Sequence, residues 1–286
     1  MRTVMLAAVL ACLLLGDTVS VVAQDLARFD PSRGVGGFIG TVEPLQRPVT
    51  LSWGEKSGIV GAVETLSLLS NERRESITTT FTGSVRRTRG GFTRRFAVSE
   101  LTINDQHVTA DRPLIVVEAW SDPQGGNVSD LDVTFPGLIE KGIAAPPPNT
   151  PQHQLWVDLF AADLAYADRP IRINTSVFNV GSYHRLLERQ VRGIMGDKDA
   201  VIVENDVATV AKGLTTVSGR KLLVAKLTGK IVGRSGANLL ILEIGGFGLI
   251  DTETGLSSGT SRTDITAIQG GREVRRTVFV DVRLLN

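Results

Sequence analysis

Five arginines gathered around a glycine pair are the densest chemical feature of the sequence: Arg86, Arg87, Arg89, Arg94 and Arg95. Gly90 and Gly91 lie between them and predict a two-residue turn. A hairpin would bring the guanidinium groups together at its tip, and guanidinium binds carboxylate or phosphate through paired hydrogen bonds. The cluster therefore predicts an anion-binding patch, with a solvated strand edge protected from aggregation by its charge as the alternative.

Residues for metal or nucleophilic chemistry are sparse. The histidines His107, His153 and His184 stand too far apart for a zinc-binding pair three to five residues apart, so we expect surface or capping roles for them. Ser218 and Lys221 match the SxxK pattern of serine acyltransferases, but the companion motifs are missing and Gly219 indicates a turn. The sequence predicts no catalytic residue.

Three pairs of acids could contribute to a calcium site, because each places two carboxylates two residues apart: Asp130 with Asp132, Asp197 with Asp199, and Asp251 with Glu253. Calcium needs six or more oxygen ligands, and none of the pairs continues into a calcium-binding loop. We expect solvated acids in turns. The sequence therefore predicts neither a metal site nor a cofactor.

The elements that position these residues are predicted to be mainly β-strands. Alternating apolar residues over 276–285 predict a half-buried C-terminal strand paired inside a sheet, and residues 239–244 and 114–120 predict more deeply buried strands. Residues 76–89 and 92–101 predict the hairpin that carries the arginines. Gly255 is suited to the left-handed conformation that closes another short hairpin.

A proline-rich stretch near the middle of the chain precedes a predicted helix. Residues 144–151 form a stiff linker, and an apolar face over 152–168 predicts the helix that follows. A second stretch, 183–194, fits helical and strand periodicity nearly equally, so both remain open.

The two halves show a weak internal match. Residues 81–85 align with 227–231, and at the same offset Gly90 aligns with Gly236 and Asp105 with Asp251. This pattern fits two copies of one β-unit, but glycine and threonine are abundant in β proteins and chance gives the same match.

The N-terminus predicts export. Residues 1–23 begin with a basic residue, continue with a short apolar run and end with small residues, which is typical of a secretory signal peptide. Cys12 offers an alternative, because its surroundings loosely resemble the site at which bacterial lipoproteins are cut and acylated. The mature chain contains no cysteine in either case, so we expect its core to stabilise the fold without disulfides. We expect the protein to be periplasmic or secreted, with a lipoprotein anchored through Cys12 as the alternative.

Charge and composition narrow the class of partner. The 31 lysines and arginines nearly balance the 30 aspartates and glutamates, so nucleic acid binding through bulk charge is not expected. No transmembrane span is predicted in the mature chain. The sequence does not indicate an oligomeric state.

Together these features predict a mainly β protein with antiparallel curved sheets in two β-rich lobes and one or two helices. The lobes comprise residues 24–143 and 152–286, on either side of the 144–151 linker. The predicted function is that of an exported, non-enzymatic envelope protein that binds an apolar or amphipathic ligand, such as a lipid, or an anionic envelope partner. The alternative is a secreted hydrolase whose site is not visible as a local motif.

Overall fold

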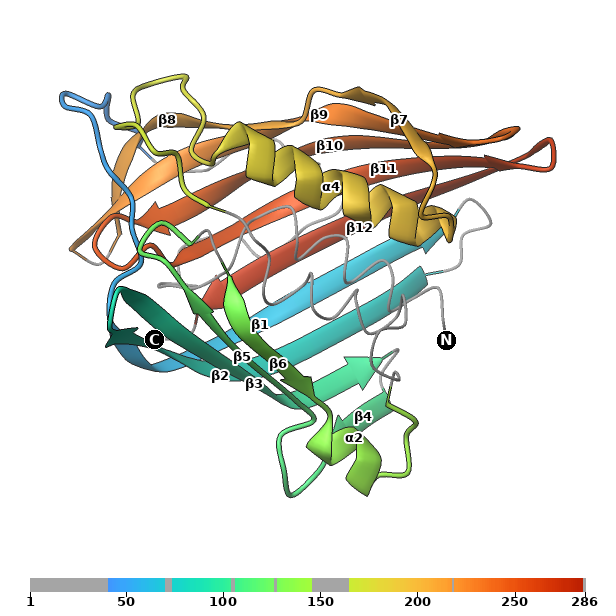
Figure 1. The fold of residues 1–286 in the computed structure, drawn as a ribbon, viewed down its shortest axis with the longest axis horizontal. Coiled ribbons are helices and arrows are strands. Elements are labelled where there is room, and N and C mark those ends of the chain that lie inside the picture. Colours follow the sequence, from blue (N-terminus) through green and yellow to red (C-terminus); the bar gives the residue numbers. More distant parts are fainter. Residues whose placement is uncertain are drawn as a thin grey trace.

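The computed structural model describes residues 41–69, 74–103, 106–125, 128–145, 165–217 and 219–284. Antiparallel strands dominate these residues, which confirms the predicted fold class (Figure 1). The strands are β1 Lys56–Leu69, β2 Arg74–Thr88, β3 Gly91–Ile103, β4 Gln106–Thr109, β5 Ile115–Ser121, β6 Ser129–Thr134, β7 Val201–Asn205, β8 Ala208–Val217, β9 Arg220–Ser235, β10 Asn238–Asp251, β11 Ser257–Gln269 and β12 Arg272–Leu284.

All twelve strands belong to one curved sheet. Its order is β6-β5-β3-β2-β1-β12-β11-β10-β9-β7, with β4 paired to β3 and β8 paired to β9. The two halves of the chain meet where β1 pairs with β12, so the strands predicted for both lobes form a continuous surface. The C-terminal strand thus lies inside the sheet, as its alternation predicts. Residues 171–173, whose apolar alternation also predicts a strand, contribute only an isolated bridge from Ile171 to Val49.

The arginine hairpin forms with a turn one residue earlier than the glycine pair predicts. Arg89 and Gly90 make the turn, and Gly91 pairs with Thr88 as the first residue of β3. Gly90 adopts a φ of 80°, which is unfavourable for residues that carry a side chain. Gly236 occupies the corresponding turn between β9 and β10 with a φ of 56°. The internal match thus falls on two hairpins, β2–β3 and β9–β10.

Residues 180–195 resolve the ambiguous stretch as a helix, α4 Val180–Met195. Asn179 caps its N-terminus by accepting a hydrogen bond from the Ser182 backbone N–H at 3.1 Å, and Gly196 ends it in the left-handed conformation. The helix runs across the sheet and packs on β9 (Figure 1). A short helix, α2 Pro136–Glu140, packs on β5 at the other end of the sheet.

The prediction of a helix over 152–168 is wrong at its C-terminal end. Residues 165–168 are not helical, because Tyr166 forms an isolated bridge with Phe178 and the backbone N–H of Ala167 donates to the Val177 carbonyl at 2.9 Å. Pairing with a neighbouring segment replaces the helical hydrogen bonds there. Residues 146–164, which include most of the predicted helix and His153, lie outside the described residues.

Gly233 lets α4 approach β9 closely. A Cβ atom at this position would meet Cγ1 of Val191 and Sδ of Met195, both on α4. A Cβ atom at Gly245 on β10 would have no neighbouring atom within 4 Å.

The Gly233→Val variant should therefore lose about 2 kcal/mol of unfolding free energy, because the added side chain forces the helix away from the sheet. Gly245→Val is the matched control and should be neutral or slightly stabilising, since a β-branched residue suits a strand with open space around it. Urea denaturation of both variants measures the difference. Equal stability losses would contradict close packing of α4 on β9.

Candidate ligand-binding face

One face of the sheet, called the inner face here, is lined by aliphatic side chains. Strand alternation and register place these side chains on the same side, and all are buried within a single hydrophobic cluster. They include Leu223, Ala225, Leu227 and Ile231 on β9, Leu240, Leu242 and Ile244 on β10, and Val278, Val280 and Val282 on β12. The side chains of the inner face therefore form one continuous apolar layer.

Helix α4 contributes a matching apolar stripe at one end of this face. Tyr183, Leu187 and Val191 are spaced at helical intervals and buried in the same cluster. Burial raises the pKa of the Tyr183 phenol far above its ordinary value, and the nearby Thr209 side chain of β8 opposes this shift. Tyr183 is thus neutral at physiological pH.

An aromatic row extends from α4 toward the arginine hairpin. Tyr183 packs against Phe178 with ring centroids 5.7 Å apart, Phe178 stacks on Tyr166 at 5.6 Å, and Tyr166 lies 6.3 Å from Trp53. The Tyr166 hydroxyl donates to the Gly255 carbonyl. Offset aromatic contacts of this kind add rigidity beyond their buried area.

Four hydroxyl side chains interrupt the apolar surface on the central strands. Thr65 and Ser67 of β1 and Ser261 and Thr263 of β11 point to the inner face, since their strand partners on β12 are Val278 and Val280. Each is at least 95% buried, and none of the four hydroxyl oxygens has a hydrogen-bond partner among the described residues. Sequence reasoning missed this hydroxyl frame, because serine and threonine occupy both faces of β11.

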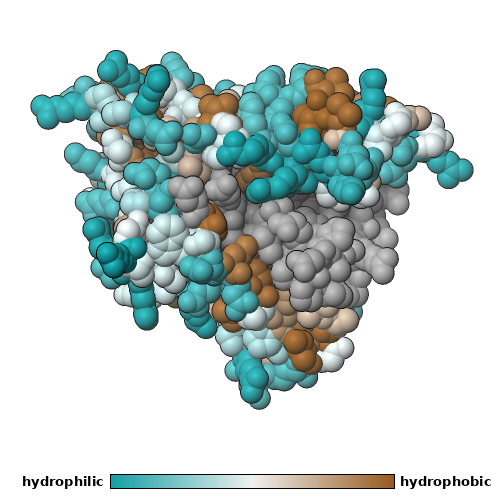
Figure 2. Space-filling view, viewed as in Figure 1, coloured by the Kyte–Doolittle hydropathy of each residue, from teal (hydrophilic) through white to brown (hydrophobic). Residues whose placement is uncertain are grey.

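On the face viewed in Figure 2, the side on which α4 lies, the coloured residues show hydrophobic side chains in separate patches among hydrophilic ones. The exposed large hydrophobic residues include Val201 and Val203 of β7 and Ile139 of α2. Among the residues described here, no helix is long and apolar enough to cross a membrane.

The structure divides the predicted arginine cluster between two faces of the hairpin. Arg86 and Arg95 lie on the outer face, Arg87 lies on the inner face over the Phe92 ring at 5.4 Å, and Arg89 is at the exposed turn. Arg95 forms an ion pair at 3.6 Å with Glu118, its partner on the neighbouring strand β5. Alternation along a strand causes this division, because neighbouring residues point to opposite faces.

Arg94 is not on the surface. It is 2% exposed, and its guanidinium lies 4.9 Å from the centre of the Trp53 ring in a cation–π arrangement. Its neighbours across the strands are Val85 and Ala119, both buried. The structure thus separates Arg94 from the exposed side chains of the predicted patch.

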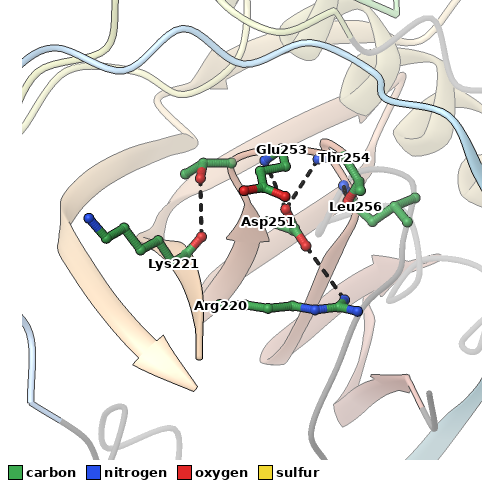
Figure 3. A network of polar contacts seen from close by, with 7 residues as sticks. Arg220, Lys221, Asp251, Glu253, Thr254 and Leu256 are labelled. Atoms are coloured by element: carbon green, nitrogen blue, oxygen red, sulfur yellow. Dashed lines mark hydrogen bonds and ion pairs between the residues drawn. The ribbon is translucent and has the colours of Figure 1, made fainter. Parts of the chain in front are cut away.

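The acid pair at Asp251 is part of a turn, as predicted, but Asp251 is buried rather than solvated. Its carboxylate accepts hydrogen bonds from the backbone N–H groups of Glu253 at 2.8 Å and Thr254 at 3.1 Å (Figure 3). Arg220 lies 3.7 Å from the same carboxylate. These bonds hold the β10–β11 turn, in which Gly255 has a φ of 69°. Asp251 is therefore a structural residue of the turn.

The remaining predicted polar residues do not converge. His107 lies on β4, where Nδ1 is 3.0 Å from Thr102 Oγ1, and His184 lies on α4, where Nε2 is 3.2 Å from the Val207 carbonyl oxygen. Gly219 forms the β8–β9 turn, as predicted, whereas Ser218 is outside the described residues. Within the described ranges, no three histidine, cysteine, aspartate or glutamate side chains are grouped so that they could hold a metal ion.

No family model matches the chain, and no curated protein matches it either. Among solved structures, the chain is similar to a LolA superfamily protein from Nitrosomonas europaea, with 9% sequence identity and a TM-score of 0.20. The match covers 80% of this chain and 86% of that one. Similarity at this level does not establish a family.

Proposed function

We propose that this protein is an exported, non-enzymatic binding protein that holds an apolar or amphipathic ligand against the inner face of its curved sheet. The observation that carries the proposal is the continuous apolar inner face that runs through both halves of the chain. Binding of this kind needs a concave, mainly apolar surface with a few polar groups. It does not need a catalytic group.

The distribution of the described helices supports this proposal. The helix contacts with the sheet are concentrated at α4 on β9 and at α2 on β5, which lie toward opposite ends of the strand order. Within the described part of the chain, no helix packs on the central strands β1, β11 and β12 as closely as α4 packs on β9 or α2 on β5. Their inner side chains are the surface on which we place the ligand.

Thr78 and Thr79 allow a direct test, because these neighbours on β2 are both half-buried but face opposite ways. Thr79 pairs with Val63 on the inner face, and Thr78 pairs with Glu64 on the outer face. Thr79→Trp should weaken binding of the apolar dye N-phenyl-1-naphthylamine at least fivefold, because the indole fills space that the dye would occupy. Fluorescence titration of the purified protein measures the dissociation constant.

Thr78→Trp is the matched control and should bind the dye like the parent protein, provided that circular dichroism shows both variants folded. If the two tryptophan variants bind equally well, the dye does not occupy the inner face. If the parent protein binds no dye and no lipid is recovered with it from the cell envelope, the proposed function fails.

We also propose that the arginine hairpin attaches the protein to an anionic envelope component, as its composition predicts. The exposed side chains of Arg86, Arg87 and Arg89 would carry this attachment, with Arg95 weakened by its ion pair to Glu118. Exposed charges act over roughly 10 Å at 0.1 M salt, so the attachment should weaken as salt rises.

Replacing Arg86, Arg87 and Arg89 together by serine should abolish cosedimentation with vesicles of phosphatidylcholine and phosphatidylglycerol at low salt. Arg94 stays unchanged because it belongs to the core. The control replaces Arg234, Arg272 and Arg275, three exposed arginines of other hairpins, and removes the same net charge. If both triple variants lost vesicle binding equally, the overall charge of the protein would explain the binding. That result would contradict a local patch at the arginine hairpin.

A further inference from the structure

We propose that the hydroxyl frame of Thr65, Ser67, Ser261 and Thr263 binds the neutral, oxygen-rich polar group of an amphipathic ligand, such as the ester group of a glyceride. This inference rests on the proposed function, because it assumes that the apolar part of the ligand lies on the same inner face. It adds the chemical class of the ligand and names the side chains that select it.

Strand register fixes the geometry of the frame. Ser261 pairs with Val280, which pairs in turn with Thr65; Thr263 pairs with Val278, which pairs with Ser67. Neighbouring strands lie about 4.8 Å apart, and alternate residues of one strand about 6.7 Å apart. The four hydroxyl groups thus mark the corners of a rectangle of roughly 10 by 7 Å, with the two valines between them. A glycerol ester has comparable dimensions and several oxygen atoms.

The hydroxyl groups point to a ligand because no described residue forms a hydrogen bond with them. Thr65 is 4% exposed and the other three are 1% exposed, and their oxygen atoms have no hydrogen-bond partner. A buried hydroxyl without a partner destabilises a protein, whereas valine or alanine would fill the same space without that cost. Four such groups around two valines therefore indicate a binding surface. No charged residue occupies these six positions, which favours a neutral polar group over an ionic one.

Glycine residues adjoin the frame on one side, where the backbones of β10 and β11 approach each other closely. Gly246 of β10 pairs with Ser261, and one step further along the inner face Gly248 pairs with Gly259 of β11. These positions carry no side chain, while the aliphatic side chains of Ile244 and Leu242 follow in the other direction along β10. An acyl chain on the aliphatic side would place its ester group at the hydroxyl frame.

The test removes the four hydroxyl groups with little change of volume in the variant T65V/S67A/S261A/T263V. The probes are monododecanoylglycerol, which carries an ester and two hydroxyl groups, and the dye N-phenyl-1-naphthylamine, which carries neither. We expect the dissociation constant for the glyceride to rise at least tenfold and that for the dye to change less than threefold. The melting temperature without ligand should stay the same or rise, because unpaired hydroxyl groups are lost.

Ser258→Ala is the matched control. Ser258 is also buried without a hydrogen-bond partner, but its partner Leu249 belongs to a separate hydrophobic cluster with Leu222 and Val224 on the outer face. This control should leave glyceride binding unchanged. A loss of glyceride affinity in Ser258→Ala equal to that in the fourfold variant would overturn the inference, because burial of any hydroxyl would then have the same effect.

The outcomes separate this inference from the proposed function. If the fourfold variant binds both probes like the parent, the frame does not recognise the ligand, although the inner face still binds it. If the parent protein binds neither probe, the proposed function itself fails. Should the fourfold variant not fold, the pairs T65V/S67A and S261A/T263V are measured separately, and unchanged selectivity in both pairs contradicts the frame.

Discussion

The pairing of β1 with β12 is the constraint on which the structure depends. Residues 61–69 pair in unbroken register with 276–284, although more than two hundred residues separate them in the chain. Loss of this pairing would split the sheet into two parts and open the edges of both central strands. The β1–β12 pairing also brings together the four hydroxyl groups of the frame. Two of them lie on β1 and the other two on β11, and β12 lies between these strands.

Charged side chains reinforce this junction on the outer face. Arg283 of β12 lies 2.9 Å from the Glu64 carboxylate of β1 and 2.6 Å from that of Asp281. Burial raises the pKa of Asp281, and the Arg283 guanidinium opposes that shift. The outer face of the junction thus carries a network of ion pairs, whereas its inner face carries aliphatic and hydroxyl side chains. Stabilisation through the outer face allows the inner face to keep groups that do not stabilise the fold.

Local sequence patterns predicted the strands well but not the surface that they form together. Alternation identified β12, and the glycine at position 90 identified the arginine hairpin, because both signals depend on residues close in sequence. The same alternation contains the information that Arg94 faces away from Arg95. Residue type alone predicts one patch, whereas alternation along β3 places Arg94 and Arg95 on opposite faces.

Two features could not be predicted because they depend on distant partners. The pairing of β1 with β12 has no local signal. The hydroxyl frame is hidden because β11 carries serine or threonine on both faces, so hydropathy does not tell its inner face from its outer one. For α4, helical and strand periods fit equally well, and the packing of the helix against Gly233 of β9 is a contact between distant residues. Tertiary contacts, rather than propensity, determined these elements.

Photolabelling with a diazirine-bearing dodecyl ester, followed by peptide mapping of the adducts, tests most directly whether the inner face is the binding surface. Binding on the inner face predicts adducts on the inner-face residues of β1, β11 and β12, such as Val63, Ile265 and Val280, and competition by unlabelled monododecanoylglycerol. Adducts mainly on outer-face residues such as Leu66, Thr260 and Phe279, or labelling that the competitor does not reduce, would contradict it.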